Sequence, residues 1–434
     1  MTQPTATVVP ADTAWMFLAT ALVLLMTPAL GFFYGGMVRA KNVLNTMMMS
    51  VASLGVVGIA WAMLGYGLAF GTGGDWVGDL AYAGLRGVGL EARGTIPHLL
   101  FMAYQGTFAI VTAALISGAI VERMRFSSYL AFIVLWMLGV YAPVAHWVWG
   151  GGWMSRLGVL DYAGGTVVHV NAAAAAVVAA VVLRPRRDYA RRALLPHNVP
   201  YVLLGAALLW FGWFGFNAGS ALGVSAAAGL AFVNTFLAPM AALVVWMLLD
   251  MRRSGRVTAV GAATGLVVGL VAVTPAAGFV SPLSALLIGA LAAVPCHFAI
   301  QYRSRTALDD SLDVLAAHGI GGITGALLTG VLAEKAWGGV DGLVGGNPKQ
   351  VALQAMGVVV AALYSIVATF TILKLVSLAL PLRSRASDEA VGLDVALHGE
   401  EAYARGEGAV LVRQTVAAPA VAPAALNTAV AGGD

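Results

Sequence analysis

The sequence has little charge and almost no cysteine. Of its 434 residues only 10% are charged and 60% are hydrophobic, whereas a soluble globular chain carries roughly 25% charged residues. A soluble protein does not need this many apolar residues, and its surface needs more polar residues than this sequence has. The net charge of +4 gives no indication of a nucleic-acid partner. The single cysteine, Cys296, excludes an intrachain disulfide framework, and we expect it to be a packing residue.

The hydrophobic residues are gathered in long runs, and about 20 apolar residues suffice for a helix to cross a bilayer. We therefore predict an all-α membrane protein with about eleven transmembrane helices. The predicted spans are 14–36, 44–70, 98–120, 127–148, 163–183, 199–217, 226–249, 258–274, 278–300, 312–332 and 350–380. The eighth span is short, and the alternative is that weak segments are re-entrant, which would change the count.

The basic residues predict the orientation of the helices. One alternate set of connections, from Arg39 and Lys41 to Arg383 and Arg385, holds sixteen Lys and Arg residues, and the other set holds five. Basic connections stay in the cytoplasm. We therefore expect a protein of the cell inner (plasma) membrane whose N-terminus lies outside and whose C-terminus lies in the cytoplasm. The first apolar run is longer than a signal-peptide core and no Lys or Arg precedes it, so we expect a retained first helix.

The order of the spans predicts an inverted repeat. Five helices precede the arginine-rich connection 184–192, five follow it, and a peripheral last helix comes after them. The fifth helix starts near Asp161 and reaches His169, and the tenth starts near Asp310 and reaches His318. The spacing from Asp to His is eight residues in both, or about 12 Å of helix. Each histidine is therefore expected near mid-depth, in helices 1–5 and 6–10 of opposite orientation, as in many transporters.

The two histidines predicted at mid-depth are candidates for a pathway. Ionisable residues inside a membrane are costly and tend to line a pathway or to pair. Two facing imidazoles could pass a small hydrogen-bonding molecule or relay a proton. The plain alternative is that His169 and His318 are packing residues with satisfied hydrogen bonds. Metal binding is a weaker idea, and bis-histidine haem in an electron carrier is the enzyme-class alternative, but we expect no cofactor and no enzymatic activity.

Three aromatic segments are expected to converge on the outer side, at 104–108, 146–152 and 212–220. An interfacial aromatic belt is the plain alternative. The segments also contain clustered glycines, a hydroxyl and no carboxylate, which favours a pocket for a small cation. Cation–π attraction supplies about 2 kcal/mol at most, far below the tens of kcal/mol needed to strip an ion of its water. A cation that sheds its proton avoids this cost, as ammonium can and potassium cannot.

These motifs resemble the ammonium transporter family, which includes Amt, Mep and Rh proteins. The matching stretches are 33–36, 104–108, 146–152, 161–172, 212–220 and 318–322, with 392–395 and 398–400 near the C-terminus. The resemblance runs from about residue 12 to about residue 405. The bacterial Amt branch fits better than the Rh branch, because the aromatic cluster is present.

The resemblance implies a role for each matching residue. Phe108, Trp149 and Ser220 would recruit ammonium, Phe108 and Phe216 would form the gate, His169, His318 and Trp213 would line the pore, and Asp161 would hold the outer region in shape. Tyr104 is a departure, because many bacterial members carry Phe there. Its extra hydroxyl is expected to alter the entrance without abolishing recruitment.

The resemblance also implies an organisation and partners. Residues 1–382 would form the ammonium-conducting domain, 383–408 a cytoplasmic regulatory tail, and 409–434 a disordered extension. The family forms homotrimers in the lipid bilayer, with one pore per subunit, and in many bacterial members a PII-type signal protein docks on the cytoplasmic face. Ammonium or ammonia is the expected substrate, with methylammonium as a further candidate. An ammonium sensor on the same fold is the alternative, although about fifty residues after the last span leave no room for a signalling domain.

Overall fold

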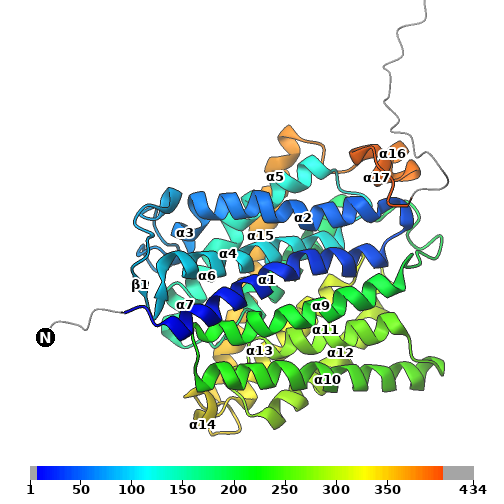
Figure 1. Cartoon of the computed structure of the whole chain (residues 1–434). Helices are drawn as coiled ribbons and strands as arrows, with labels where there is room; N and C mark the ends of the chain where they lie inside the picture. Colours follow the sequence, from blue (N-terminus) through cyan, green and yellow to red (C-terminus); the bar gives the residue numbers. More distant parts are fainter. Residues whose placement is uncertain (1–6, 404–434) are drawn as a thin grey trace, which may run out of the picture.

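The computed structural model describes residues 7–403 as a bundle of long helices (Figure 1). A small hairpin of β1 (Ala92–Arg93) and β2 (Ile96–Pro97) lies at one end of the bundle, near the start of α1 (Pro10–Met37). We call this the hairpin end. The opposite end carries the end of α1 and the last described helices, α16 (Ala386–Val391) and α17 (Leu393–His398), and we call it the tail end.

The helices of the first half agree with the predicted spans within a few residues. After α1 they are α2 (Val43–Ala60) and α3 (Tyr66–Phe70), joined by the π-turn Trp61–Gly65; α4 (His98–Leu115); α5 (Phe126–Trp136) and α6 (Ala142–Val148), joined by the π-turn Met137–Tyr141; the short α7 (Trp153–Leu157); and α8 (Asn171–Leu183), which follows the π-turn Gly165–Val170. A π-turn carries one extra residue per turn without ending the helix, so a pattern of apolar residues does not reveal it.

The second half repeats this plan. Its helices are α9 (Val199–Ala218), α10 (Ala226–Ser254), α11 (Ala259–Val273), α12 (Pro282–Arg303), α13 (Gly321–Leu332) after the π-turn Leu315–Ile320, the short α14 (Lys335–Gly338) and finally α15 (Lys349–Ala379). Ten segments of the described chain are long and apolar enough to cross a membrane, and α11, with 15 residues, is the short eighth span. The prediction of an all-α membrane protein is confirmed, and the count is compatible with eleven.

Polar caps fix where three helices of the second half begin. The side chains of Ser225, Thr258 and Ser281 each accept a hydrogen bond from a backbone N–H in the first turn of α10, α11 and α12. Such caps satisfy one of the donors that a helix start leaves without a partner. Gly255 ends α10 with a φ of 70°, a conformation that favours glycine.

Small residues let α10 and α11 approach closely. A methyl group added at Gly265 would collide with Trp246, and one added at Gly269 would collide with Pro239. Close helix contact of this kind stabilises bundles in lipid, where the solvent is as apolar as the side chains. Gly265 and Gly269, four residues apart on α11, therefore mark a close contact between these two helices.

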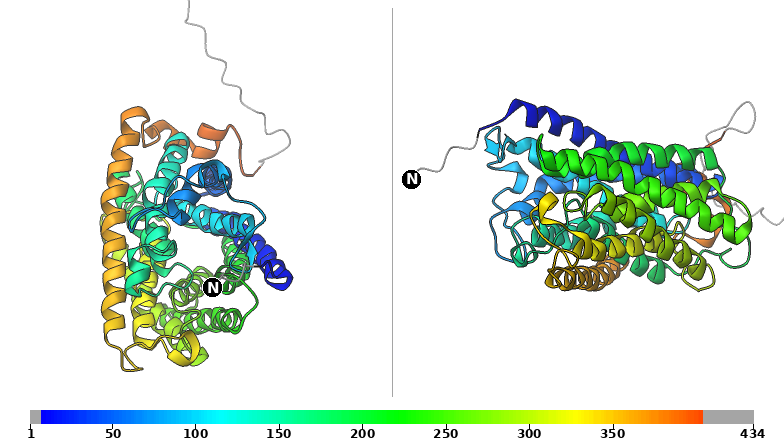
Figure 2. Two further views of the ribbon diagram at one scale, coloured as in Figure 1. Left: turned by 90° about the vertical axis from the view of Figure 1, so that its left-hand side faces the viewer. Right: turned by 90° about the horizontal axis from the view of Figure 1, so that it is seen from below.

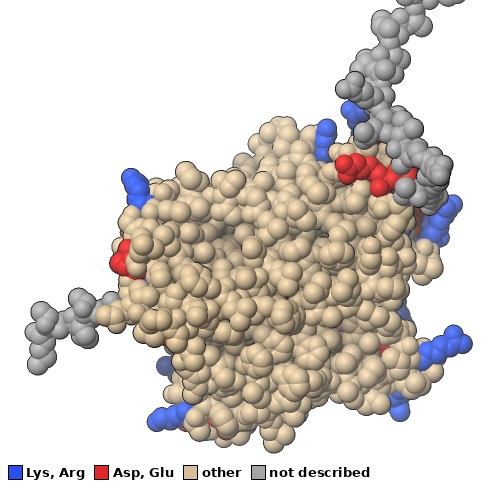
Figure 3. Space-filling view, viewed as in Figure 1, with Lys and Arg blue, Asp and Glu red and all other residues tan. Residues whose placement is uncertain are grey.

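The surface divides into two charged ends and an uncharged middle that exposes many large hydrophobic side chains. On the face drawn in Figure 3, the coloured Lys, Arg, Asp and Glu side chains lie at the hairpin end and the tail end, with none among the described residues between them. The long α15 runs along one side of the molecule, which agrees with a peripheral last helix (Figure 2). An apolar band between two charged ends is the surface expected of a chain that spans a bilayer.

The tail packs against the start of α2. The Lys41 ammonium donates to the backbone oxygens of Glu389 and Ala390 at 2.8 and 2.6 Å, and the Leu393 N–H donates to the Asn42 side-chain oxygen at 2.8 Å. Most of the predicted tail 383–408 is thus ordered against the bundle. Residues 404–408 and the predicted disordered extension 409–434 lie outside the described residues.

Candidate functional site

An aromatic pocket opens at the hairpin end, with a cavity volume of about 290 Å³. Its walls are Phe70, Phe101, Gln105, Phe108, Val148, Trp149, Tyr162, Ser220 and Leu222. The three predicted recruitment residues, Phe108, Trp149 and Ser220, thus come together from α4, the end of α6 and the end of α9. The rings of Phe108 and Trp149 meet edge to face, with centres 5.9 Å apart.

Gln105 and Val148 of the remaining wall lie in the predicted aromatic segments 104–108 and 146–152, whereas Phe70, Phe101 and Leu222 lie outside every predicted aromatic segment. Phe101, Gln105 and Phe108 follow one another at spacings of four and three, which places them on one face of α4. That spacing was available in the sequence and would have identified Phe101. Phe70 is the last residue of α3 and Leu222 follows the turn after α9, and no local pattern marks either residue.

Two stacked rings close the floor of the aromatic pocket. Phe108 and Phe216 lie with ring centres 4.2 Å apart and planes at 25°, and both are buried. Phe108 also lines the aromatic pocket, so the stacked pair adjoins that pocket. The predicted gate pair is therefore in contact.

Tyr104 supports the gate and does not line the pocket. Its buried hydroxyl lies 3.0 Å from the backbone oxygen of Gly215 and 3.1 Å from that of Phe216, to which it can donate. The Ser220 hydroxyl also donates to the Phe216 oxygen, at 2.9 Å. The extra hydroxyl that distinguishes Tyr104 from Phe thus fixes the end of α9.

His169 and His318 face each other in the interior. Their Nδ1 atoms are 3.2 Å apart, their ring planes differ by 22°, and both side chains are buried. The rings of Trp213 and Phe216 stack beside His169 at 5.4 and 6.1 Å. The His169 Nε2 atom has no hydrogen-bond partner among the described residues, although buried polar atoms are normally paired.

The contact between the two rings does not fit the bis-histidine ligation of a haem. Two imidazoles on opposite sides of one metal, each with its nitrogen about 2 Å from the metal, separate the nitrogens by roughly 4 Å, which exceeds the 3.2 Å between the two Nδ1 atoms. The described part of the chain also contains no group of three His, Cys, Asp or Glu residues that could hold a metal. The geometry favours a hydrogen-bonded pair over the haem alternative.

Each histidine lies in a π-turn that follows a buried aspartate. Asp161 precedes the turn Gly165–Val170 with His169, and Asp310 precedes the turn Leu315–Ile320 with His318. The first turn starts at the hairpin end and the second at the tail end, so the two segments run in opposite directions. This local match is what an inverted repeat requires.

Asp161 holds the start of the first π-turn. Its two carboxylate oxygens accept hydrogen bonds from the N–H groups of residues 164, 165, 166 and 167 at 2.6–3.0 Å. Burial raises the pKa of Asp161, and these four bonds oppose that effect. The Trp149 indole N–H donates to the Asp161 backbone oxygen at 2.8 Å, which joins the pocket wall to the pore turn.

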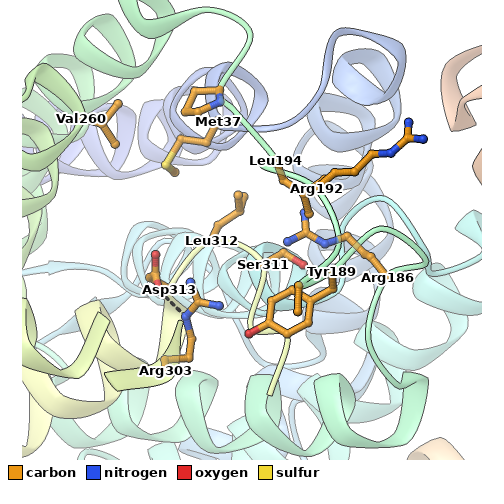
Figure 4. A pocket seen from close by; sticks show the side chains of 12 residues that line it. Met37, Arg186, Tyr189, Arg192, Leu194, Val260, Arg303, Ser311, Leu312 and Asp313 are labelled. Carbon is orange, nitrogen blue, oxygen red and sulfur yellow. Dashed lines mark hydrogen bonds and ion pairs between the residues drawn. The ribbon is translucent and has the colours of Figure 1, made fainter. Parts of the chain in front are cut away.

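A second pocket, of about 270 Å³, lies at the tail end (Figure 4). Its walls are Met37, Arg186, Tyr189, Ala190, Arg192, Leu194, Pro196, Val260, Arg303, Ser311, Leu312 and Asp313. The Arg303 Nε donates to Asp313 at 2.5 Å. Burial raises the pKa of Asp313 to about 7, against the opposing charge of Arg303. Sequence reasoning did not single out this charged pocket.

A buried ion network surrounds the charged pocket. Arg186 donates to both carboxylate oxygens of Asp309 at 2.8 Å and to Glu122 at 2.7 Å, and Arg39 donates to Glu122 at 2.9 Å. Burial acts to raise the pKa of Glu122, but the charge of Arg186 and the Arg39 hydrogen bond outweigh it and lower the pKa to about 2. The network joins residues far apart in the sequence, so no sequence motif predicted it.

Two further histidines, His146 and His297, make structural contacts. His146 is buried, with its two ring nitrogens 2.9 and 2.8 Å from the backbone oxygens of Ala69 and Gly74. His297 is buried 3.1 Å from Asp250. The plain interpretation of His146 as a packing residue, favoured by its sequence context, agrees with these contacts.

A buried polar pair between pockets at opposite ends is the arrangement of channels and transporters. The fold and the site therefore place the chain in the class of multi-pass membrane transport proteins.

The comparison with known families gives the particular family. The Ammonium Transporter Family matches residues 14–403, and the chain belongs to this family. It is 47% identical to the ammonium transporter of Bacillus subtilis over 398 residues, which are 90% of this chain and 98% of that protein. It is also 47% identical to the ammonium transporter of Aquifex aeolicus, over 90% of this chain and 93% of that one.

Solved structures show the same fold. The crystal structure of Saccharomyces cerevisiae Mep2 matches with a TM-score of 0.82 and 36% identity over 88% of each chain. A structure described as a sensor Amt protein matches with a TM-score of 0.83 and 30% identity, over 89% of this chain and 98% of that one. The higher identity to relatives named as ammonium transporters does not favour the sensor alternative.

Proposed function

We propose that this protein imports ammonium nitrogen by binding ammonium in the aromatic pocket, removing a proton and passing ammonia along a path lined by His169 and His318. Membership of the Ammonium Transporter Family and relatives named as ammonium transporters support the substrate. The geometry of the pocket, gate and histidine pair supports the mechanism.

The observation that carries the mechanism is the buried histidine pair beneath a closed aromatic gate. Moving a bare cation into such surroundings costs tens of kcal/mol, whereas the pocket's cation–π attraction is worth about 2 kcal/mol. Ammonia escapes this cost because it is neutral. The unpartnered Nε2 of His169 offers a hydrogen bond to a small molecule that reaches it.

The roles of the remaining site residues are based on their contacts. Phe108, Trp149 and Ser220 recruit the ion, and Phe108 and Phe216 form the gate through which it passes. Trp213 packs beside His169 and donates to Thr274 at 2.9 Å, so it holds the pore wall in place. Asp161 shapes the entrance through its backbone contacts and not as a ligand.

The topology proposed from the basic residues puts the hairpin end outside the cell and the tail end in the cytoplasm. Residues 1–382 then form the conducting domain of a homotrimer in the plasma membrane. Residues 383–408 form a cytoplasmic regulatory tail. A PII-type signal protein that docks beside this tail would cover the charged pocket, where the pathway ends.

The test is the double variant His169→Ala with His318→Ala in proteoliposomes. An internal pH dye reports ammonium uptake after an outside pulse, and a potassium-sensitive dye reports leakage. We expect loss of selective ammonium uptake, because the variant removes the two imidazoles that face each other in the interior. The control is His197→Ala, at the tail end beside Tyr403. Wild-type uptake with retained selectivity in the double variant would refute the role of the pair.

A further inference from the structure

A positive charge lies against the wall of the aromatic pocket. The Arg93 guanidinium carbon, on β1, is 4.5 Å from the ring centre of Phe101 and 5.7 Å from that of Phe70. Both rings line the pocket. Arg93 thus shares two aromatic rings with the site proposed to hold a cation.

Arg93 is held in this position by polar contacts. Its Nη1 donates to the Tyr66 hydroxyl at 2.9 Å and lies 3.1 Å from the His98 Nε2, and its Nη2 donates to the Phe70 backbone oxygen at 3.4 Å. Glu91, two residues away, pairs with the other nitrogen of His98. Within residues 7–403, no carboxylate forms an ion pair with Arg93, and Glu91 is directed to the far side of the His98 ring.

We propose that Arg93 is a positioning residue that weakens the hold of the aromatic pocket on ammonium and favours its loss of a proton. This inference rests on the proposed function of the pocket. A like charge nearby penalises the charged form of a group and leaves the neutral form unaffected. The ammonium ion is therefore destabilised relative to ammonia plus a proton released to water, and the atoms and charge balance without any further reactant.

The distance between the charges sets the size of the effect. A cation within about 6 Å of the Phe101 ring centre lies within about 10 Å of the guanidinium carbon, which is 4.5 Å from the same centre. Two like unit charges at that separation shift an equilibrium roughly 2-fold in bulk water and roughly 15-fold in the medium typical of a protein surface. The charge is thus strong enough to tune binding without preventing it.

The test measures KM for ammonium-driven uptake in proteoliposomes of charge-removing variants. We expect KM to fall about 2- to 15-fold in Arg93→Gln and in Arg93→Met, with no rise in the maximal rate, because both remove the repulsion. Arg93→Met keeps an apolar side chain against the rings. It provides the test if the Arg93→Gln protein is not inserted into the membrane. Arg93→Lys restores the charge, so KM returns towards the wild-type value. Loss of pocket shape alone would raise KM, which is the opposite sign.

The matched control is Arg86→Gln. Arg86 is an exposed arginine of the same connection whose guanidinium contacts only the backbone oxygens of Ala83 and Leu80. Its removal is expected to leave KM unchanged. An unchanged or raised KM in both charge-removing variants of Arg93 overturns the inference. In that case Trp149→Leu separates the two claims in the same assay. A raised KM in Trp149→Leu keeps the aromatic pocket as the ammonium site, and only the role of Arg93 is refuted. An unchanged KM in Trp149→Leu refutes the proposed role of the pocket as well.

Discussion

At the scale of single residues, the contact between His169 and His318 restricts where protons can be. The two Nδ1 atoms are 3.2 Å apart, so one must donate and the other must accept. A neutral imidazole with a proton on Nδ1 accepts at Nε2, and its partner donates at Nε2. The pair therefore presents one acceptor and one donor nitrogen along the path, which suits a molecule such as ammonia that both donates and accepts.

The hydroxyl of Tyr104 gives a prediction about stability rather than transport. Tyr104→Phe removes a contact to the backbone oxygens of Gly215 and Phe216 and leaves the pocket wall intact. We expect ammonium uptake to persist and the free energy of unfolding to fall by about 1 kcal/mol. Thermal unfolding in detergent and uptake in proteoliposomes measure the two effects. Abolished uptake in a folded variant would show that the hydroxyl acts on the substrate.

Single residues differ in how well their sequence context predicts them. Phe108, Trp149 and Ser220 could be predicted because glycines and aromatics cluster around them, and the histidines because their spacing from an aspartate recurs. Arg93 could not, since its significance depends on rings from two other segments. No residue pattern encodes such a contact.

At the scale of elements, the π-turns before α8 and α13 position the pore histidines. Each turn adds a residue to the helical path and thereby rotates the remainder of the helix, and such insertions are frequent at functional sites. The predicted spans locate both helices within about three residues of the described segments. They do not reveal the turns, because the apolar pattern continues through them.

The contact between α10 and α11 gives a prediction with a matched control. Gly265→Ala is expected to lower the free energy of unfolding by about 1–3 kcal/mol, because the added methyl group overlaps Trp246. Gly229→Ala, in α10, meets only open space and gains helix propensity of up to about 1 kcal/mol. Thermal unfolding of both variants in one detergent provides the comparison. Equal effects would mean that α10 and α11 do not depend on this close contact.

At the scale of the whole molecule, the buried ion network connects the two halves. Glu122 belongs to the first half, Arg186 to the connection between the halves, and Asp309 to the second half. Breaking a buried ion pair by removing one partner typically costs about 3–5 kcal/mol, because a charge stays buried without compensation. The network thus fixes how the halves meet at the tail end.

Glu122→Gln tests the network through pH. The folded protein holds the pKa of Glu122 at about 2, below its ordinary value of 4.5. Its contribution to stability is therefore present above about pH 4.5 and is lost as the pH falls towards 2. We expect the variant to unfold at a lower temperature than wild type at pH 7, with the difference shrinking as the pH falls below about 4.5. A difference that does not depend on pH would contradict this role.

The architecture of the whole molecule was more predictable than its charged interior. Long apolar runs determine a helical membrane bundle, because only helices satisfy their own backbone in lipid. The recurring spacing from Asp161 to His169 and from Asp310 to His318 predicted two matching segments of opposite direction. The charged pocket at the tail end was not predicted, since Arg186 comes from one connection and the pair Arg303 and Asp313 from another, and only the fold brings them together.

The central claim is that a cation crosses only if it can give up its proton. Purified protein in proteoliposomes, given equal outside pulses of ammonium and of potassium, tests it most directly when both uptake rates are recorded. The account predicts rapid uptake for ammonium and a potassium rate equal to that of protein-free liposomes. Potassium uptake at a rate comparable to that of ammonium would contradict it.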